Sequence, residues 1–185
     1  MASTLPEPRL RPATPADSKA IAVLHAESWR RNYRGAFADA YLDGDVISDR
    51  LAVWSERLDE PDSRSHTVVA ENDDHLIGFA HTQFEADPAW GALLDNLHVS
   101  HGAARRGIGG QLLAAAAAAV LERRTGLYLW VLEQNVAAQA FYDARGGTLG
   151  DRAPAPAPGG VASRLAGSPL ALRYAWSHEH LARLR

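Results

Sequence analysis

A basic, glycine-rich turn is the part of this sequence best suited to chemistry. Within Leu97–Leu112 an apolar run ends, Arg105 and Arg106 follow, and three glycines precede an alanine-rich run. Glycines let successive backbone N–H groups converge, and a helix N-terminus adds partial positive charge, so the turn suits a phosphate or pyrophosphate. Because a helix end alone stabilises an anion by only about 0.3–1 kcal/mol, the arginines and several N–H bonds must supply most of the affinity. A plain connection with solvated arginines is the alternative interpretation.

Two common phosphate-binding loops are excluded by position. A Walker A loop that begins at Gly102 needs lysine after Gly107, where Ile108 stands, and a dinucleotide fingerprint that begins at Gly107 needs glycine in place of Leu112. The G-x-S-x-G motif of serine hydrolases is absent, and the chain has no cysteine that could act as a nucleophile or a metal ligand. The basic turn therefore belongs to another class of site.

A second segment, Trp130–Gly147, has the pattern of a strand followed by a capped helix. Asn135 stands where its side chain can cap the helix, Tyr142 follows about two turns later, and Gly146 ends it. Asn135 stands about thirty residues after Arg105 and Arg106 of the basic turn.

The two segments together resemble the GNAT superfamily of acyl-CoA-dependent N-acyltransferases. The patterns V-x5-R-R-G-I-G and N-x2-A-x2-F-Y carry this resemblance, and the order of elements extends it from about Arg9 to Trp176. Two positions depart from the family pattern. Ala104 stands where Gln or Arg is usual, and Gly147 replaces a frequent aromatic residue. Because the phosphate contacts of the family are largely main-chain, we expect binding to survive the first departure.

The resemblance implies a GNAT fold that uses acetyl-CoA or coenzyme A as co-substrate and needs no metal. The segment Leu97–Val99 would run beside the pantetheine arm, the turn Arg105–Gly110 would hold the pyrophosphate, and Asn135 would contact the pantetheine region. The residues implied in cofactor binding are Leu97, His98, Val99, Arg105, Arg106, Gly107, Ile108, Gly109, Gly110, Asn135, Ala138 and Tyr142.

Acetyl transfer to an amine requires an acid, a base and a hydrogen-bond donor for the developing oxyanion. The resemblance places Tyr142 near the sulfur, where it is our candidate general acid, and a main-chain N–H near Leu97–Val99 is the expected oxyanion donor. A core aromatic is the alternative interpretation of Tyr142. Asp95 is the candidate general base, with His98 and Glu133 as alternatives. A strand carboxylate that a neighbouring donor satisfies is the other interpretation of Asp95, and some members of the family use a water chain in place of a dedicated base.

The family analogy places the acceptor pocket at the connection after the first helix and at the central hairpin. Its candidate residues are Trp29, Tyr33, Phe37 and Asp39, with packing and a solvated aspartate as the alternative. The close histidine pairs, His98/His101 and His178/His180, lack an apparent third ligand, so we expect no metal site.

The surrounding pattern predicts an α/β domain. Helices come first, three strands follow as a meander, and strand and helix then alternate, which implies a mixed sheet with helices on its faces; the GNAT resemblance puts the number of strands at six to seven. We expect a tail at 1–8, one domain over 9–185, a partly ordered connection over 29–45 and a loop over 153–160. The expected strands cover 9–11, 66–70, 76–80, 92–99, 127–132 and 168–176, and the expected helices cover about 14–28, 47–58, 112–121 and 136–144.

The composition of the chain limits the classes of molecule that it is expected to bind. The 185 residues carry a formal net charge of -3, which argues against a dedicated nucleic-acid or membrane binder. With no secretory or membrane-spanning pattern, we expect a cytoplasmic protein. A small-molecule or peptide amine is the expected acceptor, and a homodimer stays open. A CoA-binding sensor without turnover and an unrelated nucleotide-phosphate binder are the competing functions.

Overall fold

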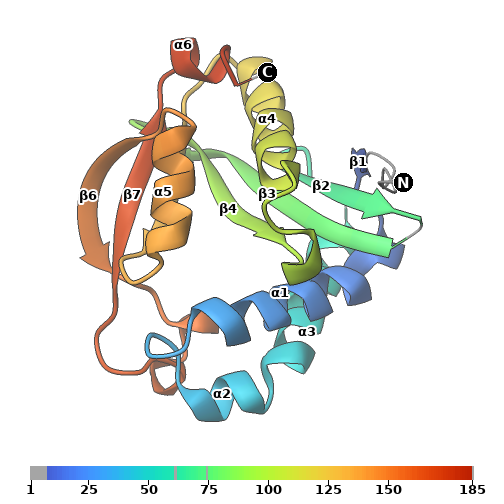
Figure 1. Cartoon of the computed structure of the whole chain (residues 1–185), viewed down its shortest axis with the longest axis vertical. Coiled ribbons are helices and arrows are strands. Elements are labelled where there is room, and N and C mark those ends of the chain that lie inside the picture. The colour runs from blue at the N-terminus through green and yellow to red at the C-terminus, as the bar shows by residue number, and fades with distance from the viewer. Residues whose placement is uncertain (1–7, 61, 74, 185) are drawn as a thin grey trace, which may run out of the picture.

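A mixed seven-stranded sheet forms the centre of the protein (Figure 1). We describe it from a computed structural model, over residues 8–60, 62–73 and 75–184. The strands follow the spatial order β1-β2-β3-β4-β5-β7-β6, and β4–β5 is the one parallel pair among those described. This confirms the predicted mixed sheet and its number of strands. The strands are β1 (Arg9–Pro12), β2 (Ser65–Asn72), β3 (His75–Asp87), β4 (Gly91–Val99), β5 (Leu127–Leu132), β6 (Thr148–Pro154) and β7 (Leu170–Trp176).

Helices cover both faces of this sheet. On one face α1 packs against α3 and against β3 and β4, whereas α4 packs on β2, β3 and β4 from the other face. α5 lies on the α4 side, because Phe141 and Tyr142 belong to the same apolar cluster as Leu112 and Leu113. The helices are α1 (Ser18–Asn32), α2 (Asp39–Asp43), α3 (Val46–Asp59), α4 (Ile108–Leu121), α5 (Val136–Ala144) and α6 (His178–Leu181). Within the described ranges, none of them has both the length and the apolar character needed to cross a membrane.

The first helical segment begins at Thr14-Pro15-Ala16-Asp17, a sequence with the signature of a helix start: a capping threonine, proline at the first helical position and an acidic residue three positions after the cap. The Asp17 carboxylate accepts a hydrogen bond from the Thr14 backbone N–H at 2.7 Å, and the Arg11 guanidinium donates two more at 2.8 and 2.9 Å. The hydrogen bonds from Arg11 are the main reason why the pKa of Asp17 is lowered to about 2. A single 3₁₀ turn at Pro15–Asp17 then leads into α1.

β4 and β5 pair at only two positions before they part. Ala92 lies opposite Leu127 and Leu93 opposite Tyr128, and no further pair joins them in the described part of the chain. β4 stays paired with β3 as far as Val99, and β5 stays paired with β7. The sheet therefore opens between β4 and β5, and Figure 1 shows β4 running away from α5 and β7 toward α1.

A β-bulge at Asp95 accompanies this opening. On β3, His81 lies opposite Asn96 and the next residue, Thr82, lies opposite Leu94, so Asp95 has no partner. A bulge adds one residue to its strand, bends the strand and increases its twist. The bulge therefore turns β4 at the point where it leaves β5.

The bulge also corrects an expectation about the faces of β4. Strict alternation predicts Asp95 on the same face as Leu97, with Leu94 on the opposite face. In the structure Leu94 packs in the same cluster as Leu97, on the α4 side, and the Asp95 carboxylate pairs with Arg57 of α3 at 2.9 Å. The extra residue interrupts the alternation of side chains between the two faces of the sheet. The residues of β4 that precede the bulge therefore lie on the faces opposite to those expected.

Several elements differ from the sequence-based expectation. β6 is not among the expected strands, because its sequence shows no apolar alternation. Its residues are exposed along most of its length. It takes up the first two residues of the expected loop over 153–160. α1 and α2 occupy part of the expected connection over 29–45, and β3 continues to Asp87. The predicted tail at 1–8 lies outside the described residues except for Pro8. Pro61 also lies outside them; proline cannot continue a helix, so the sequence predicts that it ends the helix over 47–58.

Three buried histidines lie between the sheet and the α1–α3 layer. His25, His81 and His98 are each at most 9% exposed. Burial lowers the pKa of His81 and of His98 to about 4, and it lowers that of His25 well below its ordinary value. The Trp54 indole N–H donates to His25 Nδ1 at 3.0 Å, and because indole nitrogen can only donate, this ring carries its proton on Nε2. All three rings are therefore neutral at pH 7.

These histidines predict a loss of stability in mild acid. As pH falls, the unfolded chain takes up protons near pH 6.5, whereas the folded His81 and His98 resist protonation until about pH 4. Stability is therefore present above pH 6.5 and is lost between pH 6.5 and 4. We expect the free energy of unfolding, measured by urea titration, to fall by roughly 4 kcal/mol between pH 7 and pH 5 from His81 and His98, with His25 adding to the drop.

A variant comparison isolates the cause. His81→Gln keeps a partner for the Thr67 hydroxyl and removes one titrating ring, so it should reduce the drop by roughly 2 kcal/mol. His75→Gln, at an exposed position, serves as the matched control and should leave the drop unchanged. Equal drops in wild type and His81→Gln would contradict this explanation.

Candidate active site

Two cavities meet where β4 leaves β5. One, which we call the slot, has a volume of about 300 Å³ and lies between β4 and β5, with α5 along its side. The other, which we call the aromatic cavity, has a volume of about 480 Å³ and lies between α1, α3, β4 and residues 153–158. Six residues line both cavities and define their junction: Tyr33, Leu94, Asp95, Asn96, His98 and Trp130.

The parted strands leave main-chain groups facing the slot. Ser100 N–H donates to Ile77 O at 2.8 Å, and alternate residues of a strand present their N–H groups to the same neighbour. The His98 N–H therefore faces β3, whereas the N–H and C=O groups of Leu97 and Val99 face the side from which β5 has withdrawn. An extended polar ligand in the slot would find these groups free.

Tyr142 contributes the phenol of the slot. Its ring is 8% exposed and packs against Phe141, Tyr174 and Trp176, with ring centroids 5.3 to 5.9 Å apart. Its hydroxyl makes no hydrogen bond with any described residue, and burial raises the pKa of the phenol. Gly147 adjoins this cluster, since a Cβ there would lie 2.7 Å from the Trp176 ring. The Tyr142 hydroxyl is therefore protonated at neutral pH and free to donate a hydrogen bond.

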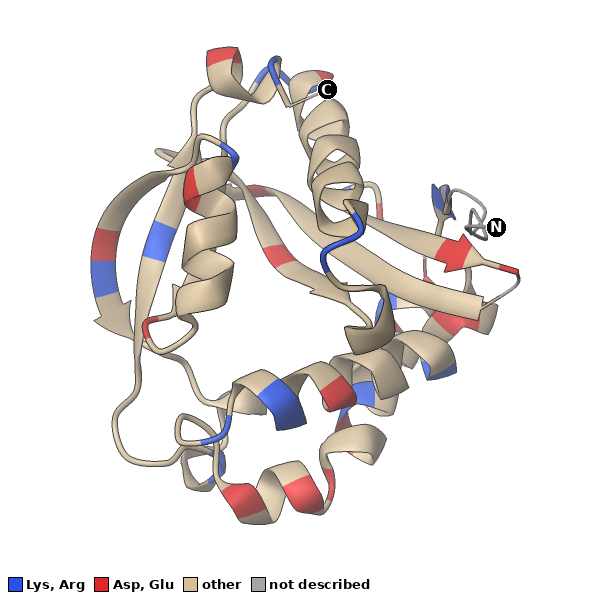
Figure 2. Ribbon diagram, viewed as in Figure 1, with Lys and Arg blue, Asp and Glu red and all other residues tan. Residues whose placement is uncertain are grey.

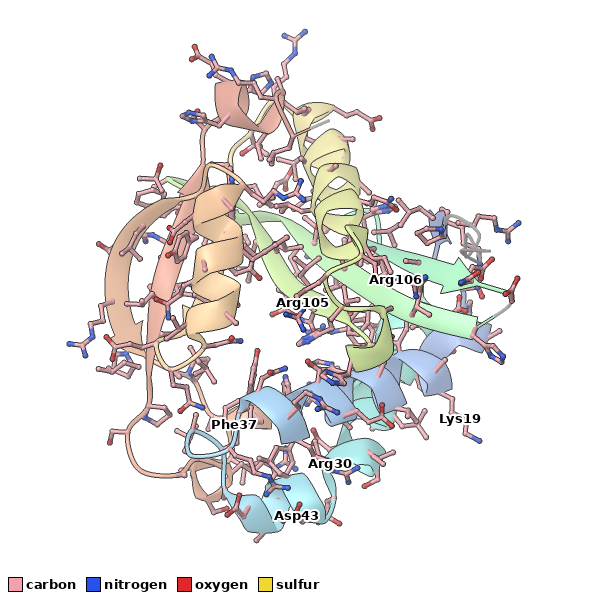
Figure 3. The ribbon with its side chains drawn as sticks, viewed as in Figure 1. Lys19, Arg30, Phe37, Asp43, Arg105 and Arg106 are labelled. Carbon is pink, nitrogen blue, oxygen red and sulfur yellow. The ribbon has the colours of Figure 1, made fainter. Side chains whose placement is uncertain are left out.

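The basic turn follows β4 and leads into α4. Gly107 takes the left-handed conformation, with φ of 84°, and its carbonyl accepts the hydrogen bond of Gln111 N–H at 3.1 Å. The N–H groups of residues 108–110 therefore have no acceptor within the helix. Arg105 and Arg106 are exposed and make no ion pair with any described residue. Figure 3 labels both on this turn, and Figure 2 shows the turn in the blue of Lys and Arg.

A third arginine at this turn was missed from the sequence. The Arg145 guanidinium lies against Gly110, where a Cβ would be 2.4 Å from its Nη2 atom, and it also lies over the Phe141 ring. Arg145 follows α5, far along the chain from the turn. No spacing pattern in the sequence joins the two segments, so only the packing of α5 against α4 brings this charge to the turn.

Asn135 caps α5 as predicted. Its side-chain oxygen accepts a hydrogen bond from Ala138 N–H at 3.2 Å. Both residues line the slot. The cap therefore holds the start of α5 beside the slot.

The three candidate bases occupy different places. Asp95 lies at the junction, and its carboxylate accepts from Arg57 at 2.9 Å and from Asn96 Nδ2 at 2.7 Å. His98 also lies at the junction, with Nδ1 2.8 Å from the Ser28 hydroxyl. Glu133 lines neither cavity and instead pairs with Arg152 at 2.8 Å. Position alone leaves Asp95 and His98.

Three of the four predicted acceptor residues line the aromatic cavity. Trp29, Tyr33 and Phe37 pack on one another with ring centroids 5.0 to 5.7 Å apart. Asp39 does not line it. This carboxylate is 72% exposed at the start of α2 and pairs with Arg34 at 2.8 Å, so we drop it from the site.

The structure adds residues that the sequence did not single out. They are Arg50, Arg57, Asn96, Trp130 and the segment 153–158. Trp130 stands in an apolar strand, Arg50 in an amphipathic helix and 153–158 in a Pro-rich run. Each of these patterns is common in segments that form no functional site. Among the described residues, no group of three or more His, Asp or Glu side chains has an arrangement that could hold a metal ion.

Comparison with known proteins assigns the chain to a family. A sequence profile of the acetyltransferase (GNAT) family matches residues 24–146, more than half of the chain. The chain belongs to the GNAT family. Its matched region includes the basic turn, the slot and most of the aromatic cavity.

Relatives of this GNAT chain agree in sequence and fold. A probable N-acetyltransferase from Mycobacterium tuberculosis (strain ATCC 25618 / H37Rv) is 32% identical over 141 residues, which cover 73% of this chain and 76% of that protein. The PaiA N-acetyltransferase from Thermoplasma acidophilum, solved in complex with coenzyme A, has a TM-score of 0.73 at 19% identity and covers 92% of this chain and 100% of its own. YncA, a putative acetyltransferase from Salmonella typhimurium solved with its cofactor acetyl-CoA, has a TM-score of 0.67 at 15% identity, over 94% and 95% of the two chains.

The conformation of the basic turn can be tested by a pair of glycines. A Cβ at Gly107 or at Gly102 would meet nothing within 4 Å, but only Gly107 has a positive φ. Gly107→Ala should therefore lower the free energy of unfolding by about 1–2 kcal/mol, whereas Gly102→Ala should leave it nearly unchanged. Urea titration of the two variants measures this. Equal stability of both would contradict a left-handed Gly107.

Proposed function

We propose that this protein is an N-acetyltransferase that moves the acetyl group of acetyl-CoA to a primary amine by direct attack in a ternary complex. The observation that carries the proposal is the junction of the slot with the aromatic cavity at Asp95 and Asn96. A cofactor arm in the slot and an acceptor in the aromatic cavity would bring their reacting groups together there. The cofactors named for the PaiA and YncA structures support acetyl-CoA as the co-substrate.

The residues of the slot and the turn fit the parts of coenzyme A. Main-chain groups of Leu97 and Val99 would pair with the amides of the pantetheine arm, in the way that an added strand pairs with a sheet edge. The N–H groups of residues 108–110 and the guanidiniums of the turn would hold the pyrophosphate. The proposed cofactor-binding residues are Leu97, His98, Val99, Arg105, Arg106, Gly107, Ile108, Gly109, Gly110, Asn135, Ala138, Tyr142 and Arg145.

The acceptor amine must lose a proton before it can attack. A primary amine with an ordinary pKa near 10 is mostly protonated at neutral pH. We assign the base to Asp95, which would accept a hydrogen bond from the ammonium and take the proton directly or through water. Arg57 and Asn96 orient its carboxylate. The nitrogen then forms its bond to the acetyl carbon.

The remaining steps use groups on the slot side. Acetyl-CoA supplies an acetyl group activated as a thioester. A main-chain N–H of Leu97 or Val99 would donate to the carbonyl oxygen as negative charge develops on it. Tyr142 would give its proton to the sulfur as the carbon–sulfur bond breaks, and the raised pKa of the buried phenol keeps that proton in place until then.

A direct test combines binding with turnover. The purified protein is incubated with acetyl-CoA and a panel of primary amines, and thiol release is followed together with product mass. The proposal expects one molecule of free CoA for each N-acetylated amine. Tight acetyl-CoA binding without thiol release across the whole panel would contradict it and favour a sensor.

The role of Tyr142 predicts a separation of turnover from binding. Tyr142→Phe keeps the ring in its cluster and removes only the hydroxyl, so kcat should fall roughly 100-fold while the Kd for acetyl-CoA stays within about twofold. Tyr128→Phe, at a tyrosine that lines neither cavity, is the matched control. Steady-state kinetics and calorimetry measure the two quantities. An unchanged kcat would remove Tyr142 from the reaction.

The choice between the carboxylate candidates can be tested in the same assay. Asp95→Asn keeps the size of the side chain but removes the charge and the base, so kcat/KM for the amine should fall by about 100-fold or more. Glu133→Gln should leave kcat/KM unchanged, because Glu133 lies outside both cavities. The opposite ranking of the two variants would overturn the assignment.

A further inference from the structure

The aromatic cavity contains a buried guanidinium that the proposed chemistry does not use. Arg50 of α3 lines the cavity, its side chain is only 9% exposed, and its guanidinium carbon lies 4.5 Å from the centre of the Trp29 ring. Arginine is almost never buried to this degree unless its charge is paired. The question is how fully the protein itself compensates this charge.

Arg50 shares its one carboxylate with a second guanidinium. Asp49 Oδ2 accepts from Arg50 Nη2 at 2.6 Å and from the Tyr41 hydroxyl at 2.7 Å, and Asp49 Oδ1 accepts from Arg164 Nη1 at 2.7 Å. No other described acidic residue forms an ion pair with Arg50 or Arg164. Burial works to raise the pKa of Asp49, but the hydrogen bonds from Arg50 and Tyr41 outweigh it, so this carboxylate is ionised. Two positive charges on one negative charge leave one positive charge uncompensated.

The other titratable groups of the cavity do not cancel that charge. Arg57 and Asp95 form a pair, so together they are neutral. Burial lowers the pKa of His25 and His98, which are uncharged at pH 7, and raises the pKa of Tyr33 to about 12. The residues that line the aromatic cavity therefore have an excess of one positive charge, because Arg50 lines it and Asp49 does not.

The junction end of the same cavity has a hydrogen-bond acceptor, whereas Arg50 at the other end is a hydrogen-bond donor. Asn96 is 7% exposed and lines both cavities, and its Oδ1 atom is buried without a hydrogen-bond partner in the described structure. Its Nδ2 atom is already bound to Asp95. An unpaired buried carbonyl oxygen costs about 1–3 kcal/mol, so the site gains when an N–H group of a ligand reaches it.

We propose that the acceptor is an amine that also carries a carboxylate, with an apolar or aromatic body, as in an amino acid. The carboxylate would lie at Arg50, the amine nitrogen at Asn96 Oδ1 and Asp95, and the body against Trp29, Tyr33 and Phe37. This inference rests on the proposed function. A cavity of about 480 Å³ accommodates a molecule of that size. Polyamines are disfavoured, because Arg50 would face a second cation.

The test compares free amino acids with their methyl esters. Phenylalanine, methionine and leucine are each titrated, beside their methyl esters, into the protein saturated with CoA, and binding is followed by calorimetry. The ester keeps the amine and the body and loses only the anion. We expect each free acid that binds to do so at least tenfold more tightly than its ester. Esters, or spermidine, that bind as tightly as or more tightly than every free acid would overturn the inference.

Variants connect the preference with Arg50. Arg50→Met keeps an unbranched side chain without the charge, so the advantage of the acid over the ester should disappear, while Arg50→Lys should retain part of it. Arg64→Met removes an exposed guanidinium that lines neither cavity and should keep the full advantage. A full advantage in folded Arg50→Met would contradict the assignment. The wild-type comparison decides the inference even if Arg50→Met does not fold.

A parallel measurement of acetyl transfer separates this inference from the proposed function. Free acids that bind selectively but are never acetylated would contradict the proposed function and support the inference about the ligand class. Esters and polyamines that are acetylated faster than every free acid would support the proposed function and contradict the inference.

Discussion

The parting of β4 from β5 is the constraint on which the site depends. Within the described residues the two strands pair at Ala92 and Leu93 alone, and the bulge at Asp95 turns β4 away before the next pair can form. Beyond that point the main-chain groups of Leu97 and Val99 have lost the neighbour that a continuous sheet would supply. Buried backbone donors and acceptors need partners, so this edge favours a ligand that extends along it and offers amides of its own. The same bulge brings a carboxylate to the junction.

Charge along the connected cavities follows a simple order. Three guanidiniums and free helix N–H groups lie at the basic turn, the junction contains the Asp95–Arg57 pair among neutral side chains, and Arg50 lies in the wall of the far cavity. His98 at the junction and His25 beside it are neutral and add no charge. In our two proposals, anionic groups of the cofactor and of the acceptor lie at the two ends and leave the centre free for proton transfer. Selectivity would then come from the ends and reactivity from the centre.

Local signals made much of the fold predictable from the sequence. The cap at Thr14 and Asp17, the left-handed Gly107 and the cap at Asn135 depend on residues within a few positions of one another. Features that depend on packing between distant segments were missed. The bulge at Asp95 depends on the register with β3, and Arg145 reaches the turn only because α5 packs beside α4. Asp39 was a reasonable choice by type and position, yet Arg34 holds it at the surface.

Amide NMR spectra of the 20.0 kDa protein during a titration with acetyl-CoA test the central claim most directly. The cofactor should shift the amide signals of Leu97 and Val99 on β4 and of Ile108, Gly109 and Gly110 at the start of α4. The amide signals of β1 and β2, at the edge of the sheet away from the slot, should not shift. Saturable binding that leaves the five named amides unchanged would contradict the account, because the cofactor would then lie outside the gap between the strands.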